Sequence, residues 1–380
     1  MKKITIIVAV LLLNLISYSQ SKSGDLQHSS GQKILKKSTT SRITIGGYAQ
    51  IDYNEPDGKE VGNLDIHRFV MLLGYKFNNK VSFLTEIEYE HVKEVFVEQA
   101  YIQYKATYKI NVLAGLMLVP MGIINEYHEP DTFYGVERPS VDKYIVPTTW
   151  REIGIGINGS IDNASLKYQA YLFNGFSSYR EGVGLLRGVD GFRKGRQKGA
   201  ESNISSPNFS TKIDFYGIQG LRLGVSGYFG KTQTDDTTIE DSTVGITMIG
   251  LDARYRYQKL ELKGQYITTK LSDTENYNTL TGKDLGSKMY GFYGVIAYNF
   301  DLKGVEKLTP FLRYEKYNTQ ASTSGSLVAN KAYDKNELVF GLNYKVANGV
   351  AFKADYQLVN NAVLGSNTSK QFNAGVALSF

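Results

Sequence analysis

The sequence predicts an all-β protein: a transmembrane up-and-down antiparallel β-barrel of about 16 strands. Three observations predict this fold. Apolar and polar residues alternate with period two in one segment after another from residue 42 onward. The joins between these segments are alternately short and long, which is typical of up-and-down barrels. The last segment, QFNAGVALSF, carries its apolar residues on one face and ends on Phe380, like the closing strand of bacterial outer-membrane barrels.

The chain begins with a predicted signal peptide, residues 1–19. Two lysines precede the apolar run ITIIVAVLLLNLI, and SYS offers small residues at a cleavage site. The run is shorter than the roughly 20 apolar residues of a spanning helix. Residues 20–41 are polar and lack apolar periodicity, so we expect a flexible periplasmic lead there. The barrel is then residues 42–380, and the expected location is the bacterial outer membrane.

Each period-two segment is interpreted as one strand of the barrel. A typical segment has about ten residues, the length that a tilted membrane strand requires. The longest joins follow residues 119 and 175. The predicted strands are residues 42–53, 64–76, 81–90, 95–105, 110–119, 151–158, 165–174, 209–215, 221–231, 244–258, 260–270, 287–300, 308–317, 337–346, 350–358 and 370–380.

Composition narrows the class of protein and its partners. The 28 Tyr, 18 Phe and 38 Gly favour strands, and the absence of Cys excludes a disulfide scaffold and thiolate metal sites. The net charge of +6 falls to +4 when two lysines leave with the signal, which is a weak case for nucleic acid. The expected partners are therefore outer-membrane lipid and small hydrophilic solutes or anions, with no nucleic acid.

The histidines carry no recognisable catalytic or metal-binding motif. His28, His67, His91 and His128 lack metal-ligand spacing, and nothing in the sequence marks a nucleophile. We predict no catalytic residue, no metal ligand and no cofactor. His67 or His91 could still point at a strand-borne Asp or Ser, so a barrel-embedded hydrolase stays open as an alternative, beside a surface adhesin and a closed structural barrel.

Charged residues of polar parity are expected to face the lumen, because Arg or Lys facing lipid near the midplane costs about 2–4 kcal/mol. Charges of both signs fall on this face, so the wall alone does not predict strict anion selectivity. The basic positions assigned to the lumen are Lys167, Lys212, Arg222, Arg254, Arg256, Lys263, Arg313, Lys345 and Lys353. The acidic ones are Glu86, Glu88, Asp214, Asp252, Glu261, Glu315 and Asp355.

The third external loop, about residues 120–150, is expected to fold into the lumen. It and its flanks hold four of the seven prolines and the single Trp. Proline fixes φ and removes a backbone donor, and the aromatic content argues against disorder. Irregular backbone at membrane depth is tolerated where it lines a cavity. We expect Phe133, Tyr134 and Tyr144 to pack on the barrel wall.

The pore constriction is predicted to lie between this loop and the facing wall. Its expected residues are Glu137, Arg138, Asp142 and Lys143, with wall positions Arg222, Asp252, Arg254 and Arg256, and further pore-lining residues Lys212, Lys263, Arg313 and Lys353. A second loop, residues 175–207, is rich in Arg and Lys. It is either a solvated surface loop or a funnel that attracts anions or lipid head groups.

One long stretch also resembles a known family. Residues 116–157, LMLVPMGIINEYHEPDTFYGVERPSVDKYIVPTTWREIGIGI, are similar to the corresponding region of the phosphate-selective porin O and P family, in particular its Bacteroidota members. The similarity extends over nearly the whole mature chain. It implies a sixteen-stranded outer-membrane porin with an inward-folded third loop, a passive channel, and often a homotrimer. Anion-selective members carry Lys where Leu118 stands, so a phosphate preference is implied less strongly than the architecture.

Overall fold

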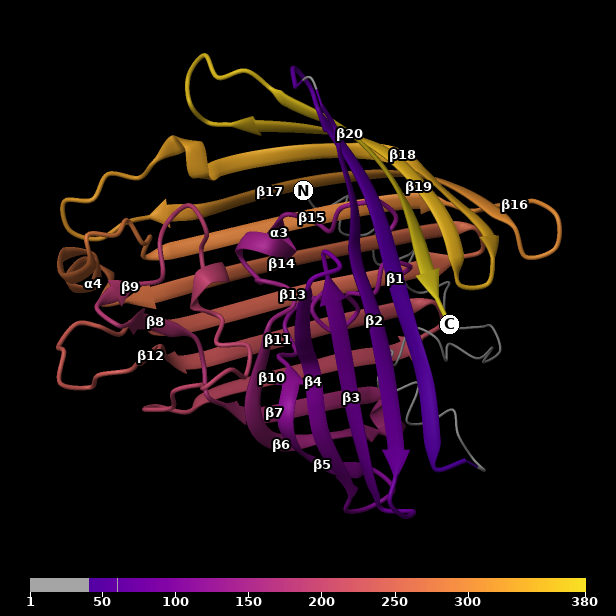
Figure 1. Ribbon diagram of the computed structural model, residues 1–380, viewed down its shortest axis with the longest axis horizontal. Coiled ribbons are helices and arrows are strands. Elements are labelled where there is room, and N and C mark those ends of the chain that lie inside the picture. Colours follow the sequence, from indigo (N-terminus) through magenta and orange to yellow (C-terminus); the bar gives the residue numbers. More distant parts are fainter. Residues whose placement is uncertain (1–40, 60) are drawn as a thin grey trace, which may run out of the picture.

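A closed barrel of sixteen long antiparallel strands confirms the predicted fold (Figure 1). The computed structural model describes residues 41–59 and 61–380, so the predicted signal peptide and residues 20–40 of the lead lie outside it. Within these residues the sheet has 17 strands. One of them, β16 (Phe300–Asp301), is a two-residue piece beside β17, which leaves sixteen in the wall. The helices in this part of the chain are too short or too polar to cross a membrane.

The wall strands pair in chain order, and β1 also pairs with β20, which closes the barrel. They are β1 (Ile43–Pro56), β2 (Asn63–Lys76), β3 (Val81–Glu90), β4 (Glu94–Lys105), β5 (Ile110–Leu118), β6 (Arg151–Ile161), β7 (Leu166–Phe173), β10 (Asn208–Ile218), β11 (Leu221–Lys231), β13 (Gly245–Tyr257), β14 (Leu260–Ser272), β15 (Lys288–Tyr298), β17 (Lys307–Ser322), β18 (Asp334–Ala347), β19 (Val350–Asn361) and β20 (Ser369–Ser379).

The polarity of the wall is the reverse of that of a water-soluble protein. On β11 the apolar side chains of Leu223 and Val225 are exposed on the outside, whereas Arg222 and Ser226 are buried on the inside. Successive side chains of a strand point to opposite faces, so the period-two pattern of the sequence separates the two environments. The outside is apolar and the inside is polar and charged, as in a barrel surrounded by lipid.

The two ends of the barrel differ in their connections. One, the short-turn end, carries tight turns such as residues 219–220 and 348–349. Gly220 has φ +74°, and a Cβ there would lie 2.1 Å from the Arg256 carbonyl oxygen, so the turn requires glycine. The opposite, long-loop end carries the third loop (residues 119–150, called loop 3) and the fourth (residues 174–207, called loop 4).

Short strands and helices lie in the long joins at the long-loop end. In loop 4 and the join after β11, a three-stranded sheet forms from β8 (Ser177–Arg180), β9 (Val183–Gly184) and β12 (Gln233–Thr234). The helix α4 (Thr274–Thr281) lies in the join between β14 and β15, and α3 (Val141–Tyr144) lies in loop 3. Two single 3₁₀ turns lie at the same end, η3 (Arg193–Gly195) and η4 (Lys331–Tyr333), whereas η2 (Asp162–Ala164) joins β6 to β7 at the short-turn end.

Candidate functional site

Asn125 fastens the two ends of loop 3 to each other. Its side-chain nitrogen donates to the carbonyl oxygens of Val119 at 2.7 Å and Trp150 at 2.8 Å, and its side-chain oxygen accepts from the Trp150 N–H at 2.7 Å. The side chain is fully buried. The loop is therefore closed at its base. Sequence reasoning missed Asn125, because bonds between residues 25 positions apart leave no local pattern.

Trp150 joins loop 3 to loop 4 and the wall. Its ring stacks on Phe176 of loop 4, with centroids 4.4 Å apart, and meets Tyr228 of β11 edge-on at 4.6 Å. The indole N–H donates to Glu152 at 2.7 Å. The single Trp of the chain is thus a fully buried anchor at the point where loop 3 returns to the wall.

Basic wall residues hold the loop 3 backbone by its carbonyl oxygens. Lys353 on β19 donates to the carbonyls of Pro130, Phe133 and Gly135, the last two at 2.7 and 2.9 Å. Three other wall cations do the same: Lys263 reaches Thr132 at 2.7 Å, Arg313 reaches Glu137 at 3.0 Å, and Lys212 reaches Gly122 at 2.5 Å. These four residues were predicted to line the pore, and in the structure they bind loop 3 inside the barrel lumen.

Wall acceptors bind the N–H groups of the same loop. Asp355 accepts from Val136 at 2.7 Å, and Glu315 accepts from Val141 at 3.1 Å. Irregular backbone inside a barrel needs such partners, because buried N–H and C=O groups are costly to leave unpaired. The mixed charge of the lumen wall therefore matches the alternating donors and acceptors of the loop.

Three aromatic residues of loop 3 pack on the wall. Tyr134 stacks on Phe311 with centroids 5.9 Å apart, and Tyr144 stacks on Tyr317 at 5.3 Å. The Phe133 ring lies under the Lys353 ammonium, 4.2 Å from it. Stacking and cation–π contacts of this kind add to the hydrogen bonds in holding the loop.

His128 ties loop 3 to strands β3 and β4. Its Nε2 lies 3.1 Å from Glu98 and 3.3 Å from Glu86, and Arg151 approaches Glu98 at 3.4 Å. Burial alone lowers the pKa of His128, but the two carboxylates outweigh it and hold the pKa well above its usual range. A charged imidazolium is therefore part of the loop's attachment, a role that the sequence did not indicate.

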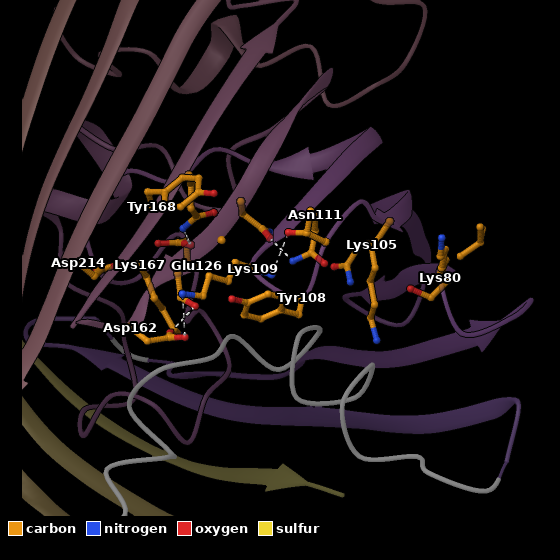
Figure 2. A pocket seen from close by; sticks show the side chains of 18 of the residues that line it. Lys80, Lys105, Tyr108, Lys109, Asn111, Glu126, Asp162, Lys167, Tyr168 and Asp214 are labelled. Atoms are coloured by element: carbon orange, nitrogen blue, oxygen red, sulfur yellow. Dashed lines mark hydrogen bonds and ion pairs between the residues drawn. The ribbon is translucent and has the colours of Figure 1, made fainter. Parts of the chain in front are cut away.

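A cavity of about 830 Å³ opens at the short-turn end (Figure 2). The turn residues Lys80 and Tyr108 and the β4 residue Lys105 line it, and loop 3 contributes Glu126 and Tyr127. Of residues 41–59 and 61–380, six basic and three acidic ones line it: Lys76, Lys80, Lys105, Lys109, Lys167 and Arg222, against Glu126, Asp162 and Asp214. Its lining has a net positive charge.

A second cavity, of about 490 Å³, lies at the long-loop end. Loop 3 contributes Glu137, Arg138, Ser140, Lys143 and Tyr144 to it. Among the residues that the structure describes, its charged lining residues are Lys59, Arg138, Lys143 and Lys335 against Glu137 and Glu337, so this described lining is also net positive. Loop 3 contributes to the lining of both cavities.

The structure divides the predicted constriction residues into separate groups. Glu137, Arg138 and Lys143 line the cavity at the long-loop end, whereas Arg222 lines the one at the short-turn end. Asp142 was expected to face water and is instead fully buried, where its carboxylate accepts from Gln265 at 2.8 Å. Burial raises the pKa of Asp142 to about 7.

The remaining wall positions also fail to form one ring with the loop 3 charges. Asp252 and Arg254 are buried, with Arg254 stacked over the Tyr127 ring at 4.6 Å. Arg256 is half exposed and pairs with Glu261 at 3.0 Å, close to the turn at residues 258–259. Loop 3 covers the middle of the lumen wall, so residues predicted to face water across the lumen contact the loop instead.

The Arg-rich loop 4 is only partly solvated. Arg193 donates to the Thr148 carbonyl at 3.2 Å, and Arg196 donates to the carbonyls of Pro147 and Thr149 at 3.1 and 3.2 Å. Arg193 and Arg196 of loop 4 thus bind the C-terminal end of loop 3 and help to hold it in place.

The closed barrel has the architecture of outer-membrane porins. Solved structures of similar fold include Salmonella typhi OmpF in complex with daunomycin, with TM-score 0.59, 12% identity and coverage of 89% of this chain and 97% of that one. Two more are the outer-membrane channel DcaP of Acinetobacter baumannii (0.58, 10%, 89% and 97%) and an anion-selective porin from Comamonas acidovorans (0.55, 12%, 89% and 99%). At these identities the likeness establishes the fold.

The family of the chain follows from a closer relative. An uncharacterized protein of Aquifex aeolicus (strain VF5) is 33% identical over 338 residues, which cover 83% of this chain and 75% of that protein. The chain belongs to the same family as this protein. No family model matches the sequence.

Proposed function

We propose that the protein is a passive outer-membrane channel of the porin type for small hydrophilic solutes and ions. The observation that carries the proposal is the closed barrel with an apolar outside and a charged inside. Such a barrel satisfies every backbone group within the sheet and presents an apolar band to lipid. The long-loop end then faces the cell exterior and the short-turn end faces the periplasm, with no enzyme activity and no cofactor.

In this proposal solutes pass along loop 3, which sets the narrowest section of the path. The cavities at the two ends are the entrances on either side of the loop. Both are lined by more cations than anions, which attracts small anions, phosphate among them, in dilute salt. Preference stays weak, because the wall carries both signs. Two observations support a homotrimer. One is the resemblance to the phosphate-selective porin O and P family. The other is the trimer form of OmpT of Vibrio cholerae, a solved structure of similar fold with TM-score 0.55, 10% identity and coverage of 89% of this chain and 99% of that one.

Recording single channels across a planar bilayer under a KCl gradient tests the proposal. We expect stable conductance steps and a reversal potential whose sign indicates anion preference. This preference should fade at high salt, because the Debye screening length falls to about 3 Å at 1 M. Charge reversal Arg138→Glu at the long-loop cavity should shift the preference toward cations. Lys194→Glu is the matched control, since Lys194 is exposed and lines neither cavity.

The outcomes separate the candidate functions. A folded barrel that gives no conductance steps would refute the channel and leave an adhesin or a closed structural barrel. Turnover of ester or peptide substrates without conductance would favour the hydrolase. Equal shifts with Arg138→Glu and Lys194→Glu would mean that the long-loop cavity is not on the ion path.

A further inference from the structure

Two histidines and an aspartate converge at the long-loop end of the barrel. Asp65 and His67 lie near the start of β2, and His91 lies in the three-residue turn between β3 and β4. His91 Nδ1 is 2.5 Å from Asp65 Oδ2, and His67 Nδ1 is 3.8 Å from the same oxygen. The potential ligand atoms of all three residues lie within 4.8 Å of one another. The group is called the rim cluster below.

Backbone geometry brings the three side chains together. The pairing of β1 with β2 passes from Gln50–Arg68 to Asp52–Asp65, so His67 lies in a bulge of β2. Bulges redirect side chains and recur next to functional sites. His91 is the cross-strand neighbour of His67: its N–H donates to the His67 carbonyl at 3.2 Å, and its φ of 52° is left-handed. A left-handed His is uncommon, and here it accompanies the contact with Asp65.

From this geometry we propose that Asp65, His67 and His91 form a binding site for one borderline divalent transition-metal ion, such as Zn²⁺, Ni²⁺ or Cu²⁺. Two imidazole nitrogens and one carboxylate oxygen are a donor set that these ions prefer and that Ca²⁺ and Mg²⁺ do not. Tetrahedral zinc with bonds of about 2.0–2.1 Å needs ligand atoms roughly 3.3 Å apart. Small side-chain rotations bring the three atoms to that spacing, and a fourth position stays open for water.

The surroundings of the rim cluster fit a metal ion. The side chains of Asp65, His67 and His91 are 22%, 32% and 41% exposed, so an ion in solution can reach them. Glu90 Oε1 lies 3.9 Å from His91 Nε2, close to the place of a carboxylate that orients a metal-bound histidine through its second nitrogen. A bound ion would link β2 to the β3–β4 turn, close in the chain to Val61 and Asn63, which border the long-loop cavity.

A second cluster of similar composition is buried and serves as a comparison for the rim cluster. Glu86, Glu98 and His128 also have ligand atoms within 4.8 Å of one another, but their side chains are at most 2% exposed. The carboxylates of Glu86 and Glu98 already accept hydrogen bonds from Tyr48. Glu98 also accepts hydrogen bonds from Thr149 and Arg151. Access from solvent therefore distinguishes the rim cluster from the buried one.

Metal titration of the folded barrel in detergent, after treatment with a chelator, tests the proposal. The parent for these measurements carries His28→Gln, which removes a histidine of the N-terminal segment from the count. Zinc and nickel chloride, titrated by calorimetry, should each show one site of micromolar affinity. Copper(II) bound at equimolar ratio should give an electron paramagnetic resonance spectrum with hyperfine structure from two nitrogens.

Variants of the ligands give the decisive comparison. His67→Asn and His91→Asn should each weaken zinc binding by at least about tenfold. Lys93→Gln, in the same turn but offering no ligand, should bind as the parent does. Unheated and boiled samples should migrate differently on detergent gels for every variant, which shows that each barrel is folded. The proposal is overturned if folded parent protein shows no saturable binding up to about 1 mM metal, or if the two histidine variants bind as tightly as the parent. Conductance measured with chelator present tests the channel separately.

Discussion

Replacing Lys353 by methionine should release part of loop 3 without opening the barrel wall. Methionine keeps most of the apolar length of the side chain and removes the three hydrogen bonds to the carbonyls of Pro130, Phe133 and Gly135. Each buried carbonyl left without a partner costs about 1–3 kcal/mol. The variant also no longer buries an ammonium, which offsets several kcal/mol of that cost.

The net effect is that the free energy holding residues 130–135 against the wall falls by about 2–4 kcal/mol. At 1.36 kcal/mol per factor of ten, the undocked population of the loop then rises by about 30- to 900-fold. Trypsin cleavage after Lys143 reports this population, because the cleavage rate follows the open fraction when opening is fast. We expect cleavage at least about 30-fold faster, with larger and noisier single-channel currents.

Lys345→Met on the neighbouring strand β18 is the control. This lysine was predicted to face the lumen and is half buried, but within the described chain it makes no hydrogen bond to loop 3. The rate of tryptic cleavage and the single-channel current of the Lys345→Met variant should match those of the parent protein. If the Lys353 variant also matches the parent in both measurements, the carbonyl contacts do not hold the loop, and the reasoning fails.

Three more outcomes follow from loop 3. Deleting residues 131–146 should raise single-channel conductance severalfold, and an inserted deletion variant with unchanged conductance would place the loop off the path. Asn125→Ala removes the bonds that join Val119 to Trp150 and should lower the thermal midpoint of the heat-dependent gel shift, whereas an unchanged midpoint would show the base of the loop to be held elsewhere. His128→Gln should destabilise the protein most at low pH. The pKa of His128 is raised in the folded state, so its contribution to the free energy of unfolding is complete below the unfolded-state pKa of about 6.5 and is lost as pH rises through the folded-state pKa. A stability difference that grows with pH would contradict this.

The sequence alone determined the barrel. The fold depends on a pattern of period two that repeats over the length of a membrane strand, and strand after strand carries that signal independently. Errors in strand ends, such as residues 308–317 against the observed Lys307–Ser322, leave the pairing intact. The aromatic contacts of Phe133, Tyr134 and Tyr144 were also foreseen, because stiff apolar residues in a loop inside a barrel have only the wall to pack on.

Only the tertiary structure decided what the charged residues of the lumen do. Parity indicates that Lys353 and Arg254 point inward, but not whether they meet water or loop 3. That choice depends on contacts between residues as far apart as Pro130 and Lys353, and a sequence pattern records no such distance. The same holds for the rim cluster, where His91 meets Asp65 and His67 because two strands pair in one register. Local alternation fixes faces, whereas partners across the lumen follow from how the closed barrel brings distant strands together.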